Sequence, residues 1–271
     1  MIIKNTDIPR PGEGPGATLT DCFDRAVRAY LDRTGHDRVE LRAALCVMDG
    51  TLYDSMPRHA EAWHRMMLTQ GLDIPPERFF LLEGRTGAST LNQQLNENLA
   101  RTLTPEQCKE LYAVKSENFH RLQQQSGISP KPGAQRVVAR CMERGITPVL
   151  VTGSGQSTLI DCLDRDYPGA FSAALRVTSH NVTHGKPHPE PYLKALDMAG
   201  VTANNAFVLE NAPLGVDAGA AAGVFTLAVR TGPVPEDDLD GAGADLVFPS
   251  MPALAAVFDV LLDRIARIRL M

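Results

Sequence analysis

Apolar residues near the start of the chain recur first at helical spacing and then as a continuous run. Between Thr18 and Leu31 they fall on one side of a helix, with Asp and Arg residues on the other side. The pattern predicts a helix that packs on the core ahead of a buried strand, which the apolar run from Leu45 indicates. Residues 7–16 hold Pro and Gly too often for regular structure, so we expect a mobile lead-in there.

Helical and extended patterns alternate through the second half of the chain. The helical segments are residues 135–144, 156–163, 190–199 and 215–222. The extended segments are residues 147–151, 173–178, 206–209 and 224–229. This alternation predicts an α/β fold, a parallel sheet covered by helices on both faces. Ligands of such sheets bind beyond the carboxyl ends of the strands, so the residues that follow each strand form the candidate site.

Residues 57–129 show helical patterns and no strand. Residues 59–68 and 104–122 are the clearest of these patterns. Thr104 begins the second one as N-cap, with Pro105 at the first helical position and Gln107 at the third. We therefore predict an α/β core at residues 41–56 and 130–271, a helical insertion at 57–129, and an N-terminal extension with its helix at 1–40.

Composition and charge restrict the class of protein. With 271 residues, 44% of them hydrophobic, the chain can bury a sizeable core. A net charge of -5 argues against general binding to nucleic acid or to an anionic membrane. The chain has no 18-residue apolar run and its first residues lack the apolar region of a signal peptide, so we expect a cytoplasmic protein.

The cysteines are odd in number, widely scattered and free of any Cys-x-x-Cys pair. We interpret all five as reduced thiols of the core: Cys22, Cys46, Cys108, Cys141 and Cys162.

The residues after the first apolar run carry the strongest motif. Asp49-Gly50-Thr51-Leu52 resembles the end of the haloacid dehalogenase (HAD) signature Asp-x-Asp-Gly-Thr-Leu, and the resemblance makes Asp49 the general acid/base. Val47 stands where that family has its nucleophilic aspartate. A valine has no lone pair, so it can neither attack phosphorus nor bind a cation. In an alternative register of the motif, Asp49 itself is the nucleophile. In a second alternative the segment has no catalytic role and is simply a buried strand followed by a turn.

Three later strand ends resemble the other HAD motifs, which implies a Rossmann-like parallel core with an inserted α-helical cap. Thr152 then binds a phosphoryl oxygen, assisted by Gly153 and Ser154 at a helix N-terminus. Lys186, in Gly-Lys-Pro-x-Pro-x-Pro, balances the phosphoryl charge. The fourth motif supplies Glu210 and Asn211, which with Asp49 would hold Mg²⁺ in a site weakened by the neutral amide. A helix-capping carboxylate is the alternative for Glu210.

Within the superfamily the chain is most similar to beta-phosphoglucomutase-like proteins. His59 and Trp63 match the start of that group's cap, and residues 83–89 match its substrate loop, which implies substrate contacts from Arg85 and Thr86. His59 could equally be a structural histidine of the cap. The mutase pattern has an arginine and an acid where this chain has Gly87-Ala88, which puts mutase activity in doubt.

These residues leave three functional hypotheses. The first is a HAD phosphatase or mutase by descent that acts on or binds a small phosphorylated metabolite, a sugar phosphate, with catalysis impaired by Val47. Loss of a nucleophile costs on the order of 10⁶ in turnover in a well-studied hydrolase. The second is a non-catalytic binding protein with a regulatory role. The third is an enzyme in which Asp49 activates water for direct attack. We expect no nucleic-acid or membrane partner, and the oligomeric state stays open, with a monomer among the options.

Overall fold

The computed structural model describes residues 1–9, 16–154 and 157–270. Most of the lead-in predicted at residues 7–16 lies outside the described residues. Short 3-10 turns accompany the regular elements at η1 (Asn5–Asp7), η2 (Pro76–Phe80), η3 (Ala173–Leu175) and η4 (Ala203–Asn205).

The core is a six-stranded parallel sheet in the order β3-β2-β1-β4-β5-β6. Its strands are β1 (Ala43–Cys46), β2 (Thr147–Val151), β3 (Arg176–Val177), β4 (Ala206–Glu210), β5 (Phe225–Val229) and β6 (Leu246–Phe248). The chain leaves β1 toward β2 and β3 on one side and later returns to β4 on the other. The order therefore reverses at β1, and this switch point is where α/β sheets bind ligands.

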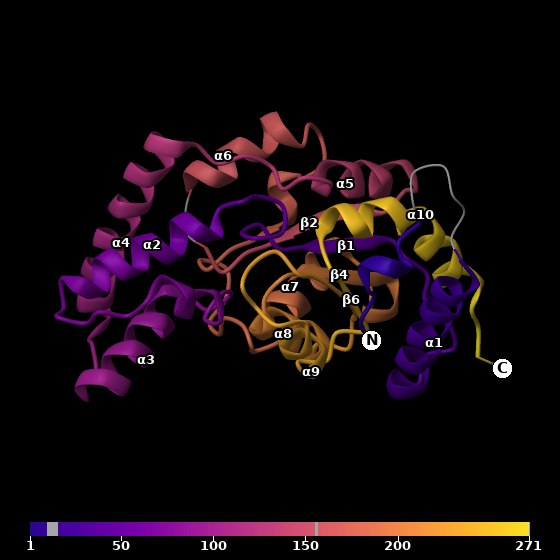
Figure 1. Cartoon of the computed structure of the whole chain (residues 1–271), viewed down its shortest axis with the longest axis horizontal. Coiled ribbons are helices and arrows are strands. Elements are labelled where there is room, and N and C mark those ends of the chain that lie inside the picture. Colours follow the sequence, from indigo (N-terminus) through magenta and orange to yellow (C-terminus); the bar gives the residue numbers. More distant parts are fainter. Residues whose placement is uncertain (10–15, 155–156, 271) are drawn as a thin grey trace.

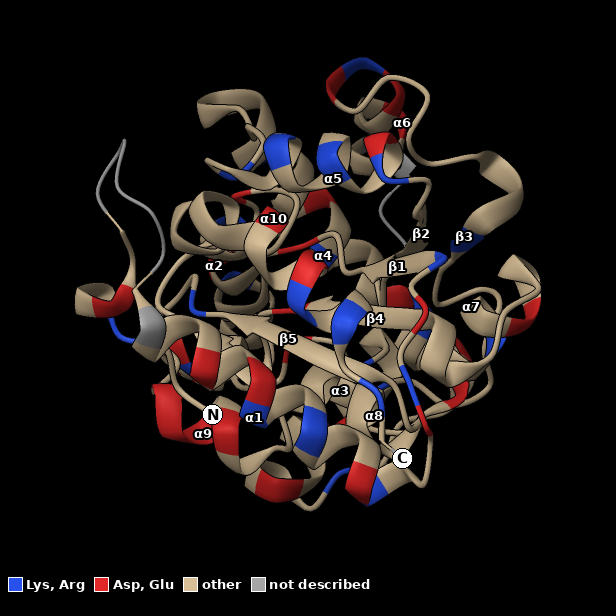
Figure 2. Cartoon of the chain, turned by 90° about the vertical axis from the view of Figure 1, so that its right-hand side faces the viewer, with Lys and Arg blue, Asp and Glu red and all other residues tan. Residues whose placement is uncertain are grey.

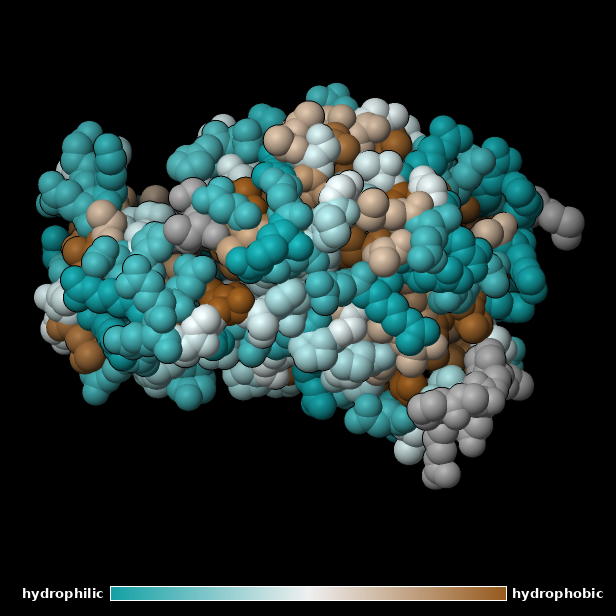
Figure 3. Space-filling model, turned by 90° about the horizontal axis from the view of Figure 1, so that it is seen from above, coloured by the Kyte–Doolittle hydropathy of each residue, from teal (hydrophilic) through white to brown (hydrophobic). Residues whose placement is uncertain are grey.

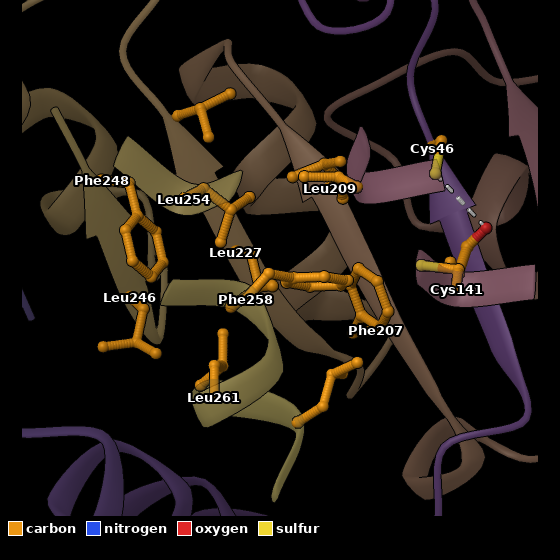
Figure 4. Packing of buried hydrophobic residues seen from close by; sticks show 14 of the residues in the cluster. Cys46, Cys141, Phe207, Leu209, Leu227, Leu246, Phe248, Leu254, Phe258 and Leu261 are labelled. Atoms are coloured by element: carbon orange, nitrogen blue, oxygen red, sulfur yellow. Dashed lines mark hydrogen bonds between the residues drawn. The ribbon is translucent and has the colours of Figure 1, made fainter. Parts of the chain in front are cut away.

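Helices cover both faces of the sheet, as predicted (Figure 1). One face carries α1 (Ala17–Thr34), α5 (Ala134–Glu143), α6 (Ser157–Asp166) and α10 (Met251–Arg267). The other carries α7 (Glu190–Ala199) and α8 (Pro213–Ala221), with α9 (Glu236–Gly241) beside them. Successive residues of β1 alternate between the faces, because Ala44 belongs to the first cluster and Leu45 to the second. Figure 4 shows Phe207 and Leu227 packed against Phe258 of α10.

The regular structure between β1 and α5 is helical. It comprises α2 (Met56–Leu68), α3 (Gly87–Leu99) and α4 (Pro105–Ser126), which lie together at one end of the molecule (Figure 1). These helices share a hydrophobic cluster of their own around Trp63, Phe79 and Leu95. Thr104 caps α4 through a complete capping box with Gln107, which confirms the predicted helix start. The result is a parallel α/β core with an inserted helical segment, here called the cap.

Two parts of the element prediction were wrong or incomplete. Residues 173–178 were predicted as extended, but the first three form η3, because Ser172 accepts the N–H of Ala174 and begins a 3-10 turn. Only Arg176 and Val177 pair with β2. The sequence prediction also lacked β6 and α10, which complete one edge and one face of the core.

The molecular surface mixes both charges. Figure 2 shows basic and acidic residues interspersed, and several form ion pairs, among them Arg144 with Asp263 and Arg33 with Asp245. Seen from above, the cap end is mostly hydrophilic and hydrophobic areas are small and separate (Figure 3). Among the described residues, no helix is both long and apolar enough to cross a membrane.

Candidate functional site

Val47 lies at the carboxyl end of β1, in the centre of the sheet. Its N–H still donates to the Leu209 carbonyl at 3.1 Å, so the backbone keeps the sheet register past the last residue of the strand. The side chain is 3% exposed and lines a cavity between core and cap. An isopropyl group thus occupies the place from which a strand-end nucleophile would face a ligand.

Asp49 points into the same cavity and is held by two donors. Its Oδ1 accepts a hydrogen bond from Ser55 Oγ at 2.6 Å and lies 2.9 Å from His59 Nε2. Burial by itself would raise the pKa of this carboxyl. The hydrogen bonds from His59 and Ser55, together with the nearby Lys115, outweigh burial and lower the pKa. Asp49 is therefore an ionised carboxylate at neutral pH.

A buried lysine of the cap extends this network. Lys115 of α4 lies with its Nζ 2.7 Å from His59 Nδ1. When Lys115 is protonated it donates to Nδ1, so Nε2 carries the ring proton and donates it to Asp49, which makes His59 neutral. Burial and the neighbouring Lys115 lower the pKa of His59, in agreement with that tautomer.

The surroundings of Lys115 are aromatic. Its Nζ lies 5.3 Å from the ring centroid of Trp63, 5.6 Å from that of Tyr112 and 5.2 Å from that of Phe119. Burial lowers the pKa of Lys115 to about 7, although Asp49 opposes this. The sequence prediction missed this residue. The sequence did contain one signal. Lys115 lies four residues after Leu111 and four before Phe119, so all three side chains are on the same face of the helix.

The end of β2 supplies the predicted hydroxyl. Thr152 is 4% exposed, and its Oγ1 accepts the N–H of Ser154 at 3.0 Å. Thr152, Gly153 and Ser154 all line the cavity. A Cβ on Gly153 would lie 2.6 Å from the carbonyl oxygen of Gly84, so the cap loop rests directly on this turn.

Lys186 and Glu210 form a fully buried ion pair behind the cavity. Lys186 Nζ donates to Glu210 Oε1 at 2.6 Å, and Tyr192 donates to the same oxygen at 2.9 Å. Glu210 Oε2 accepts the backbone N–H groups of Asn211 and Ala212 at 2.7 and 3.1 Å. These four hydrogen bonds use all the lone-pair positions of the carboxylate.

Asn211 connects the core to the cap. Its Oδ1 accepts from Thr51 Oγ1 at 2.8 Å, and its Nδ2 donates to Glu83 Oε2 at 2.9 Å. Glu83 Oε1 is buried without a partner. Burial and the nearby carboxylates of Glu210 and Asp49 raise the pKa of Glu83 well above its ordinary value. The sequence prediction did not single out Glu83.

The donors present can be compared with those a Mg²⁺ ion needs. Val47 offers none, and Glu210 is saturated as the partner of Lys186. Asn211 and the main-chain carbonyl of Asp49 remain from the predicted set. The unpartnered Glu83 Oε1 adds a carboxylate oxygen from the cap. Asn211 faces Glu83 with its Nδ2 and Thr51 with its Oδ1, so the amide would have to turn over before both residues offer oxygen to a hard cation.

Of the two cap residues predicted to contact substrate, one lines the cavity and the other does not. Arg85 lines the cavity, and its guanidinium donates to Ser89 Oγ at 3.1 Å. Thr86 is the N-cap of α3, accepting the Ser89 N–H, and does not line the cavity. The Tyr112 ring would lie 2.2 Å from a Cβ on Gly87, so a tyrosine fills the space that a side chain at position 87 would need.

The cavity enclosed by these residues is small. Its free volume is about 60 Å³, enough for a few water molecules. A sugar phosphate is larger than that. We therefore expect the cap to move away from the core when such a ligand enters.

Comparison with known proteins agrees with this geometry. Residues 48–223 match the family model of haloacid dehalogenase-like hydrolases. The chain is similar to hexitol phosphatase A of Escherichia coli (strain K12), at 28% identity over 75% of this chain and 88% of that one. It is similar to the beta-phosphoglucomutase of Mycobacterium bovis at 26% identity, over 79% and 92%. A solved structure named as a putative beta-phosphoglucomutase from Bacteroides vulgatus shares 42% identity, with a TM-score of 0.87 over 92% of this chain and all of that one.

Proposed function

Since the chain belongs to the haloacid dehalogenase-like hydrolase family, we propose that it binds a small phosphorylated metabolite, a sugar phosphate, between the sheet and the cap. We further propose that Val47 prevents formation of an aspartyl-phosphate, so that phosphatase or mutase turnover is strongly impaired. One observation carries this proposal. Thr152 and Arg85 line one cavity with Val47, so a hydroxyl and a guanidinium able to bind phosphate lie around a position that cannot attack it.

The roles of the residues follow from their contacts. Thr152 and the backbone N–H groups at the start of α6 would bind phosphoryl oxygens, because a helix N-terminus favours an anion. The Lys186 ammonium, fixed by Glu210, would balance phosphate charge from behind the cavity wall. Ionised Asp49, held by neutral His59, would accept a proton from a substrate hydroxyl.

Mg²⁺ would be held by Asn211, the Asp49 main chain and Glu83, and when bound it would neutralise phosphoryl charge. Glu210 would then act through Lys186 and not as a direct ligand. The segment 57–129 would close over the ligand as the cap, with Arg85 as its cationic contact.

Val47 also favours a second candidate, a regulatory protein that binds the metabolite and releases it unchanged. The two candidates share the binding site and differ only in turnover. Direct attack by water that Asp49 activates would give slow hydrolysis without a phosphoenzyme.

The test combines binding and turnover on the same preparation. Glucose 6-phosphate should bind in calorimetry, while Mg²⁺-dependent phosphate release stays near background. Thr152→Val should weaken binding about tenfold or more, since a hydrogen bond to a charged group contributes about 1.5–3 kcal/mol. Thr178→Val, outside the cavity, is the matched control.

Two results would decide against the proposal. Equal affinity of wild type and Thr152→Val would place the ligand elsewhere. A trapped phosphoenzyme on Asp49, together with rapid turnover, would establish the alternative register and remove the claim of impaired catalysis.

A further inference from the structure

The turn between β3 and α7 presents different residues to its two sides. Lys186 is directed inward and is 2% exposed, paired with Glu210. His184 and His188, two residues before and after it, are exposed on the outer side. Glu190, the first residue of α7, lies beside both histidines. The outer residues take no part in the cavity.

These three side chains converge. One nitrogen of each histidine and one carboxylate oxygen of Glu190 all lie within 4.8 Å of one another. His184 Nδ1 is 2.9 Å from Glu190 Oε2, and the two imidazole centroids are 4.6 Å apart. Within residues 1–9, 16–154 and 157–270, this is the one group of three such side chains close enough to share an ion.

The backbone holds the group in place before any ligand arrives. Glu190 Oε1 accepts the Thr183 N–H at 2.7 Å, and Oε2 accepts the His184 N–H at 2.8 Å. These bonds tie the start of α7 back onto the turn. The sequence restricts the turn further, because Pro187, Pro189 and Pro191 alternate with the residues between them. Little conformational entropy would be lost on ordering the ligands.

The donor set selects a class of cation. Two imidazoles and one carboxylate suit Zn²⁺ and its neighbours in the first transition row, whereas Mg²⁺ prefers an all-oxygen shell. Zn²⁺ bonds of about 2.0–2.2 Å place tetrahedral ligand atoms roughly 3.4 Å apart, within the spacing observed here. We propose that His184, His188 and Glu190 form a binding site for a Zn²⁺-type cation, with a fourth position open to water. His188 is held in place by a separate contact, because its Nδ1 accepts the backbone N–H of Glu190 at 3.1 Å.

Binding there would brace the phosphate-site lysine from outside. The ion would link residues 184, 188 and 190, which flank Lys186 on both sides, so the turn should become less mobile. This site does not depend on the proposed function, since no phosphate ligand takes part in it.

The experiment uses the full, tag-free chain after treatment with EDTA, with Zn²⁺ alone as the ligand. We expect one equivalent to bind in calorimetry, and Co²⁺ to give the visible absorption of a four-coordinate nitrogen and oxygen site. His184→Ala and His188→Ala should each weaken Zn²⁺ binding at least tenfold. Hydrogen exchange of residues 183–190 should slow when Zn²⁺ is added.

His180→Ala is the matched control, because His180 is exposed on the same connection but outside the group. It should bind Zn²⁺ as wild type does. Failure of wild type to bind Zn²⁺, or full binding by the double variant His184→Ala/His188→Ala, would overturn the proposal. Either result leaves glucose 6-phosphate binding unaffected, so the two proposals fail separately.

Discussion

At the scale of single residues, Val47 determines what the site can do. Its neighbours suit an anionic ligand, yet the residue itself is an apolar side chain buried at a strand end. The sequence already predicted that the nucleophile is missing, because the Gly-Thr pair fixes the register of the motif and so places Val47 at the nucleophile position. The burial of Val47 shows what a charge at this position would cost, since its side chain is only 3% exposed.

We predict that Val47→Asp makes stability depend on Mg²⁺. An unpaired carboxylate at this depth should cost about 3–5 kcal/mol without a cation. Mg²⁺ binds the folded form, so it should restore the melting temperature. Weak p-nitrophenyl phosphate hydrolysis should appear with it. Melting and turnover are measured together across a magnesium titration.

The control for this prediction is Val47→Asn, which adds polar atoms of similar size but no charge and no nucleophile. It should gain neither turnover nor a strong magnesium response. A folded Val47→Asp protein that behaves like the asparagine variant would mean that Glu83 and Asn211 do not complete a metal site, and the binding-protein candidate would take the lead.

Lys115 permits a prediction about pH. Its pKa is lowered from 10.5 in the unfolded chain to about 7 in the folded protein. Between these values the unfolded chain binds one proton more, so this lysine makes stability rise with pH above about 7. In urea unfolding, the free energy of unfolding of the wild type should rise relative to that of Lys115→Met by on the order of 1 kcal/mol per pH unit.

The exposed Lys109 of the same helix provides the control, and Lys109→Met should keep the wild-type pH dependence. Parallel pH curves for wild type and Lys115→Met would show that the amine is not desolvated in solution.

At the scale of elements, local patterns predicted most of the architecture for a physical reason. Parallel strands buried on both faces appear as short apolar runs, so β2 at residues 147–151 was predicted with its observed bounds. Strand β3 has two residues and β6 has three, which is too short for any periodicity to register. Helix α10 had a readable signal, a Ser250 N-cap followed by Pro252 and apolar residues at helical spacing, but no family motif drew attention to it.

Most of the site residues predicted from the sequence belong to motifs at or after strand ends, namely Asp49, Thr152, Lys186 and Glu210. His59 and Arg85 were predicted in the cap from the resemblance alone, and both line the cavity. Glu83 is different, because its partner Asn211 lies 128 residues away and only the closed cap joins them. Contacts of that type depend on how two separately packed units meet. No local pattern of hydrophobicity encodes them.

At the scale of the whole molecule, the small cavity and the close contact of Gly84 with Gly153 imply that ligand exchange requires the cap to open. We predict that Gly153→Ala hinders closure, because its Cβ would lie 2.6 Å from the Gly84 carbonyl oxygen and 3.1 Å from that of Arg85. Core and cap pack on their own clusters, so global stability should change little. Hydrogen exchange of residues 83–86 should quicken, and glucose 6-phosphate should bind more weakly.

Gly241→Ala, with no atom within 4 Å of its new Cβ, should leave both unchanged. If hydrogen exchange of residues 83–86 is the same in Gly153→Ala as in the wild type, the turn at residue 153 shifts to make room for the new methyl group, and the cap closes without this contact.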